Sequence, residues 1–283
     1  MPARRSRASP ANRIVSAAAH AALALLLLGG GQARPAEPAP TPAPAPFKAP
    51  SPAPDDSVQY AKCLDAARKA PAAALKTAED WRTAGGGFPA DHCAAVALFG
   101  LKRYPEAAGR FEALAGAMMV RGPDMRAGAL QQAGQAWLLA NEPLKARSDF
   151  DAALSFTPED PDILIDRARA AAESLDWKGA VADLDRALAL APGRADALVY
   201  RASAWRQLGD LDHARTDVAA AIAAAPHDAA GLLERGIIRR LAGDAAGAGA
   251  DWRQVEKDAP GSPEAASAKA NLARLGADEN KPE

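Results

Sequence analysis

The sequence predicts an all-α fold assembled from repeated pairs of helices. Prolines recur at intervals of 34 residues, at Pro158, Pro192, Pro226 and Pro260, and a fixed period of this length indicates a helical solenoid. Alanine dominates the apolar residues, and aromatic residues make up only 5% of the chain, which disfavours a β-sandwich or a barrel. Together these observations favour helical hairpins that stack on one another.

Apolar residues recur with the same 34-residue period as the prolines. Small residues hold one position of the repeat, at Ala146, Ala180, Ala214 and Ala248. Leucines hold a second position, at Leu130, Leu164, Leu198 and Leu232. Bulkier residues hold a third position, at Phe150, Leu184, Val218 and Trp252. Each unit therefore has two helices whose apolar faces it cannot cover alone, and the next unit must complete the core.

The pattern resembles the tetratricopeptide repeat family across residues 127–260. Leu208-Gly209-Asp210-Leu211 matches a short turn between two helices, and Ala221-Ile222 leads to the terminating Pro226. The resemblance implies a right-handed α-α superhelix. At the small position inside the first helix the units differ, with Gly134, Ala168, Ala202 and Gly236. Alanine also allows helices to pack closely, so this departure leaves the predicted fold unchanged.

Changes in composition and phase divide the chain into six parts. Residues 1–33 form a predicted signal peptide, and residues 34–54 form a predicted disordered linker rich in Pro and Ala. Residues 55–126 are expected to form divergent helical repeats. The regular units are expected at 127–160, 161–194, 195–228 and 229–262. A capping helix is expected at 263–276, before a disordered tail at 277–283.

The N-terminus has the layout of a secretory signal peptide. Four arginines precede an apolar run from Ile14 through Leu28, and Gly31 and Ala33 supply the small residues of a cleavage site. The run is shorter than the roughly 20 apolar residues of a secure membrane span. Cleavage near Ala33 predicts a periplasmic or otherwise exported protein, whereas a retained signal would anchor the chain to a membrane.

An aspartate recurs in the second helix of every regular unit, at Asp149, Asp183, Asp217 and Asp251. Eighteen residues after these positions lie the basic residues Arg167, Arg201, Arg235 and Lys269. Pairing within a unit would leave Asp149 opposite Ala133, so we expect structural ion pairs across the unit boundaries, which would fix the register. The alternative is a binding site for a metal or a basic ligand.

Cys63 and Cys93 are the only cysteines, and each falls in the first helix of its unit. An exported chain meets an oxidising compartment, so we expect them to form a disulfide. The alternative is two buried, reduced cysteines. His92 lies next to Cys93, but its surroundings match no zinc motif and offer no third group to orient a nucleophile, so no metal site or catalytic site is expected.

The family resemblance implies that the first helices line a concave groove. The groove positions, carried over residue by residue, hold Gln131, Gln135, Ile165, Arg169, Glu173, Val199, Ser203, Arg206, Leu233, Ile237 and Arg240. Family members that grip a C-terminal carboxylate use Lys and Asn at two of these positions, and neither occurs here. The mixture of apolar and charged side chains favours an extended or helical partner segment with apolar anchors.

The sequence thus favours an exported, non-enzymatic scaffold that holds a protein or peptide partner in the cell envelope. No convergent set of carboxylate, His or Ser groups indicates catalysis, and no cofactor is expected. Removal of the signal peptide changes the formal net charge from −1 to −5, and such a chain is a poor candidate for binding nucleic acid. We also expect no stable membrane span unless the signal is retained. The alternative function is a small-molecule carrier, or an enzyme accessory subunit, with its ligand in the groove.

Overall fold

The computed structural model describes residues 54–118 and 122–279, and within these ranges it contains thirteen α-helices and no β-strand. The predicted signal peptide, and the predicted linker apart from Pro54, lie outside the described residues. None of the described helices combines the length and the apolarity that a bilayer span requires. The described part of the chain is therefore all-helical, as the composition predicts.

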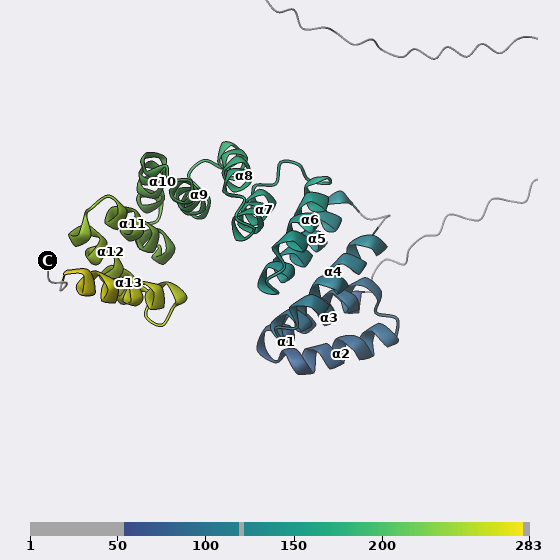
Figure 1. Ribbon diagram of the computed structural model, residues 1–283. Coiled ribbons are helices and arrows are strands. Elements are labelled where there is room, and N and C mark those ends of the chain that lie inside the picture. The colour runs from purple at the N-terminus through teal and green to yellow at the C-terminus, as the bar shows by residue number, and fades with distance from the viewer. Residues whose placement is uncertain (1–53, 119–121, 280–283) are drawn as a thin grey trace, which may run out of the picture. The chain divides into compact units, whose positions relative to one another are not determined.

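The helices alternate along the chain between two positions in successive hairpins (Figure 1). The first helices are α1 (Pro54–Lys69), α3 (Gly87–Gly100), α5 (Pro123–Leu139), α7 (Pro161–Glu173), α9 (Ala195–Gln207) and α11 (Ala229–Leu241). The second helices are α2 (Pro71–Thr83), α4 (Tyr104–Ala117), α6 (Pro143–Leu154), α8 (Trp177–Leu190), α10 (Leu211–Ala224) and α12 (Ala245–Asp258). The last described helix is α13 (Pro263–Glu279).

Every second helix packs between two first helices. For example, α8 contacts α7 of its own hairpin and α9 of the next, and α12 contacts α11 and α13. The periodic prolines lie in the connections between hairpins, with Pro158 between α6 and α7 and Pro226 between α10 and α11. Proline lacks a backbone N–H and restricts the residue before it, so it ends one hairpin where the next must begin.

Two helix boundaries differ from the sequence prediction. α5 begins at Pro123, before the expected start of the regular units at residue 127, because proline suits the first turn of a helix. α13 continues to Glu279 instead of ending near residue 276. Gly276 therefore lies inside α13 and does not provide the C-terminal cap that glycine commonly supplies.

A residue with positive φ separates the two helices of each regular hairpin. These turn residues lie 34 positions apart, at Asn141, Leu175, Gly209 and Gly243. Glycine and asparagine tolerate this left-handed conformation, whereas it costs a leucine roughly 1–2 kcal/mol. The next residue is an aspartate in three hairpins, and its carboxylate caps the second helix by accepting a backbone N–H bond, at Asp176, Asp210 and Asp244.

In the four regular hairpins, the size of one core side chain matches the size of its neighbour on the facing helix. Where the second helix carries an aromatic ring, at Phe150 or Trp252, the first helix has Gly134 or Gly236 opposite it. A Cβ at Gly134 would lie 2.5 Å from the Phe150 ring, and a Cβ at Gly236 would lie 2.3 Å from Nε1 of Trp252. The hairpins with smaller second-helix residues pair Ala168 with Leu184 and Ala202 with Val218. The departure from a uniform small residue therefore follows from packing.

We predict that Gly236→Ala destabilises the protein by about 1–3 kcal/mol, because the added methyl group overpacks the site of Trp252. Trp252→Leu makes room for that methyl group, so Gly236→Ala should be neutral or slightly stabilising in the Trp252→Leu background. Urea unfolding of both single variants and the double variant measures this coupling. Additive effects of the two substitutions would contradict the packing explanation.

The predicted disulfide is present in the structure. Cys63 of α1 and Cys93 of α3 are bonded, their Cα atoms are 6.1 Å apart, and both residues are buried. The bond joins the first helices of the first two hairpins, where the sequence is least regular. A disulfide with a sequence separation of 30 residues contributes roughly 3–4 kcal/mol on the chain-entropy account.

Candidate functional site

The predicted groove residues all lie on first helices. They are Gln131 and Gln135 on α5, Ile165, Arg169 and Glu173 on α7, Val199, Ser203 and Arg206 on α9, and Leu233, Ile237 and Arg240 on α11. Neighbouring first helices contact each other from α5 through α7, α9 and α11 to α13. We call the surface that these residues share the first-helix face. Ile165 and Val199 are buried beneath it, so their side chains offer little surface to a partner.

A buried carboxylate joins α5 to α7. Asp166 is buried, and its Oδ2 accepts hydrogen bonds from Nε2 of Gln131 at 2.9 Å and of Gln135 at 2.7 Å. Nη1 of Arg169 donates to Oδ1 at 3.1 Å. A buried charge needs such partners because its desolvation otherwise costs several kcal/mol. Three of the predicted partner-binding residues therefore already stabilise contacts within the chain.

An ion pair joins α9 to α11. Nε of Arg206 donates to Oε1 of the buried Glu234 at 2.5 Å, and Nη2 donates to Oγ of Ser203 at 3.1 Å. Between α7 and α9, Nη1 of Arg194 donates to Oδ1 of Asp162 at 2.7 Å. Charge reversal at Arg206 would therefore break a buried pair as well as change the first-helix face.

An imidazole joins three first helices near the N-terminal end of the described chain. Nδ1 of His92 on α3 lies 2.7 Å from the hydroxyl of Tyr60 on α1, and Nε2 lies 3.1 Å from Oε1 of Gln132 on α5. Burial lowers the pKa of His92, although the hydrogen bond to Gln132 opposes that shift. The ring is therefore neutral near pH 7, with Tyr60 donating to Nδ1 and Nε2–H donating to Gln132. This arrangement gives His92 a structural role.

A hollow of about 320 Å³ opens in the middle of the first-helix face. It is lined by Gln131, Gln135, Asp162, Ile165, Asp166, Arg169, Arg194, Asp196 and Tyr200, which come from α5, α7, α9 and the residue before α9. Tyr200 is 40% exposed, and the guanidinium of Arg169 lies 5.8 Å from the centre of its ring. The three aspartates of the lining are each hydrogen-bonded to an arginine or a glutamine of the lining. The central hollow thus offers polar groups and one exposed ring, with its charges already paired.

The prediction that these ion pairs cross the unit boundaries was wrong, because each arginine pairs with the aspartate of its own hairpin. Arg167 donates to both carboxylate oxygens of Asp183, and Arg201 does the same to Asp217, each within one hairpin. Arg235 likewise pairs with Asp251, whereas Lys269 is exposed on α13. The partners lie 16 residues apart and equally far from the positive-φ turn residue, so the antiparallel helices bring them face to face. Ion pairs across the unit boundaries do form, as Arg167–Asp151 and Arg201–Asp185. Their acids lie two residues after the predicted partners Asp149 and Asp183.

Asp149 lacks the arginine that its counterparts have. The equivalent position holds Ala133, and Oδ2 of Asp149 is buried without a hydrogen-bond partner among the described residues. Burial and the nearby carboxylate of Glu112 raise the pKa of Asp149 to about 7. The sequence prediction rejected pairing within a hairpin because it would leave this carboxylate unpaired. In the structure the other aspartates pair within their hairpins, and Asp149 alone among these four is left without an arginine.

We predict that Asp149→Asn stabilises the protein at pH 8 by about 1 kcal/mol, a value reduced for solvent screening of this half-buried group. The pKa of the Asp149 carboxyl is about 7 in the folded chain and near 3.8 in the unfolded chain, so its contribution is favourable below pH 4 and is lost as the pH rises to 7. Urea unfolding at pH 4 and pH 8 should show the gain only at pH 8.

The matched control for that prediction is Asp217→Asn, which removes a carboxylate that Arg201 pairs at 2.7 Å. It should destabilise the protein at pH 8 by about 1–3 kcal/mol. A loss of stability at pH 8 in both variants would show that the folded chain stabilises Asp149 in its ionised form, which contradicts a raised pKa for this carboxyl.

Sequence reasoning missed five residues of the central hollow, namely Asp162, Asp166, Arg194, Asp196 and Tyr200. The acids on α7 gave a usable signal, because Asp162 and Asp166 lie one helical turn apart and Asp166 follows Ile165, which was assigned to the groove. Tyr200 gave a weaker one. It lies 34 residues after Asp166 and therefore holds the same repeat position on α9.

The described helices define a solenoid of hairpins whose first helices are bridged by polar side chains. No family model and no curated protein matches the chain. Among solved structures, it is similar to a tetratricopeptide repeat protein from Parabacteroides merdae, with 15% identity over 80% of this chain and 88% of that chain and a TM-score of 0.65. It is also similar to a thermophilic tetratricopeptide repeat protein from Thermus thermophilus, with 17% identity over 68% of this chain and 100% of that chain and a TM-score of 0.55. The chain therefore has an all-helical, tetratricopeptide-like solenoid fold.

Proposed function

We propose that this chain is an exported, non-enzymatic scaffold that holds a peptide or protein partner against its first-helix face in the cell envelope. The central hollow is the observation that carries this proposal. Its lining comes from three successive first helices, so no single hairpin contains the site. A surface that exists only in the stacked array suits a partner that extends along several repeats.

The chemistry of the central hollow favours binding to a polypeptide. Tyr200 offers an exposed aromatic ring, and Arg169 lies beside it. Tyrosine and arginine are among the residue types enriched at the energetic centre of protein interfaces. The amides of Gln131 and Gln135 are held in place by Asp166, which pre-organises the wall of the site.

Export is supported by the layout of the N-terminal residues and by the disulfide. The arginines, the apolar run and the small residues at Gly31 and Ala33 follow the order of a secretory signal. Structural disulfides such as Cys63–Cys93 persist in oxidising compartments. We propose that the mature chain begins near Arg34 and acts in the periplasm or an equivalent compartment.

Site-specific photocrosslinking in the native cells tests the proposal. A benzophenone amino acid at position 200 should give a crosslinked protein adduct, because Tyr200 lines the central hollow. The same amino acid at position 144 should give none, because Leu144 is also exposed but lies on the second helix α6. The adduct should come from the exported fraction, with an N-terminus near residue 34. Equal crosslinking at both positions, or an adduct confined to the cytosol, would contradict the proposal.

A further inference from the structure

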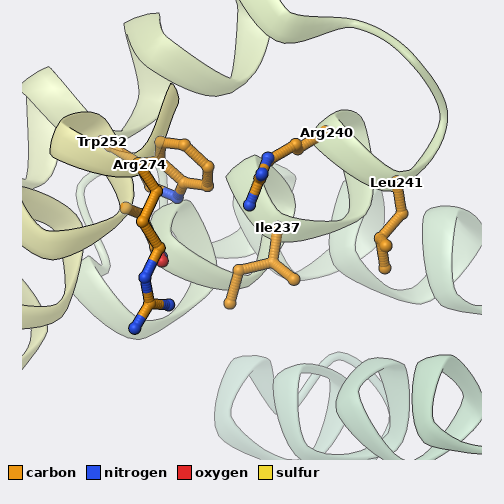
Figure 2. Close-up of a pocket in the computed structure, with 6 residues that line it drawn as sticks. Ile237, Arg240, Leu241, Trp252 and Arg274 are labelled. Carbon is orange, nitrogen blue, oxygen red and sulfur yellow. The ribbon is translucent and has the colours of Figure 1, made fainter. Parts of the chain in front are cut away.

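A second hollow, of about 590 Å³, lies where the last hairpin meets α13. It is lined by Ile237, Arg240, Leu241, Trp252, Asn271 and Arg274. Figure 2 shows Ile237 and Arg240 on one side of this hollow and Arg274 on the other. We call it the terminal pocket. Among the described residues, its lining includes two arginines and no carboxylate, whereas the lining of the central hollow includes three aspartates.

The terminal pocket continues the first-helix face by one more repeat. Asn271 and Arg274 on α13 lie 34 residues after Ile237 and Arg240 on α11, which were already assigned to the groove. The helix expected only to cap the solenoid therefore supplies two residues in register with the groove positions. Extending the period past residue 262 would have found both of them in the sequence.

The acid that pairs with Arg206 has no counterpart at the equivalent position one repeat later. Arg206 pairs with Glu234, which lies 28 residues later on the next first helix. The residue 28 positions after Arg240 is Ala268, which is completely buried and carries no charge. Arg240 does interact with another residue of the chain, whereas Arg274 is exposed on α13, so Arg274 is the residue to substitute in a binding test.

Apart from Asn271 and the two arginines, the described lining of the terminal pocket is apolar. Leu241 is 58% exposed at its rim, and Ile237 lies between the two arginines in the lining. The indole N–H of Trp252 is already satisfied by the carbonyl of Leu233 at 3.3 Å, so the ring contributes an apolar wall. A ligand that fits this lining presents a carboxylate beside an apolar side chain.

We infer that the terminal pocket binds an acidic peptide segment, with an Asp or Glu carboxylate held by Arg274 and Arg240 and a neighbouring apolar side chain packed on Ile237 and Leu241. Guanidinium groups suit this ligand because they pair with carboxylates through two parallel hydrogen bonds. The inference rests on the proposed function and adds to it the charge of the partner and the end of the face at which the partner is anchored.

Selection from a library of random heptapeptides displayed on phage tests the inference. Sequences retained by the purified chain should be enriched in Asp or Glu next to an aliphatic or aromatic residue, and Arg274→Glu should abolish that enrichment. Lys269→Glu is the matched control, because it makes the same charge change at an exposed position of α13 outside the pocket. A fluorescein-labelled copy of the most enriched peptide should bind Arg274→Glu about tenfold more weakly and Lys269→Glu with no more than about a twofold change.

The remaining outcomes separate this inference from the proposed function. Retained peptides without acidic residues, or equal affinity for the parent and Arg274→Glu, would overturn the inference. Acidic peptides whose binding is lost in Tyr200→Ala but kept in Arg274→Glu would place them in the central hollow, which leaves the proposed function intact. A library with no enriched sequence would also overturn the inference, while crosslinking at position 200 decides the proposed function independently.

Discussion

The burial of each second helix between two first helices is the constraint on which the rest of the structure depends. In α12, Trp252 and Val255 are buried by α11 on one side and by Ala265 and Ala268 of α13 on the other. A single hairpin would leave the side that α13 covers in water, at a cost of roughly 25 cal/mol for each Å² exposed. Stacking therefore provides the stability, and it also brings the first helices side by side, which creates the first-helix face.

Polar bridges between the first helices give the stacking its register. Apolar alanine faces tolerate small displacements, whereas Asp166 and Glu234 are buried carboxylates that become costly once their partners move away. The same requirement explains why much of the middle of the face is occupied by contacts within the chain. At the C-terminal end, Ala268 takes the place of such an acid, and Arg274 remains exposed. The distribution of paired and exposed charge along one face thus follows from which repeats keep the bridging carboxylate.

The period in the sequence was sufficient to predict the hairpins and the positions of Pro158 and Pro226 between them. The pairing of Cys63 with Cys93 was predicted from the two cysteines of a chain expected to be exported. The period was insufficient for the side-chain partners. Ion pairing was assigned so that no acid stayed unpaired, yet Asp149 is unpaired in the structure, because antiparallel geometry decides which residues face each other. The predicted groove residues lie on first helices, but a periodic pattern does not show which of the polar ones, such as Gln135, bind within the chain.

Hydrogen exchange of a chain that ends at residue 262 tests most directly whether each hairpin is completed by the one after it. Without α13, the buried face of α12 around Trp252 and Val255 would be open to water. Amide protection in α11 and α12 should then fall close to that of an unfolded chain, while α7 and α8, covered by α9, keep the protection they have in the full chain. Unchanged protection in α12 would contradict the account, because it would mean that a hairpin of this protein is stable with one side bare.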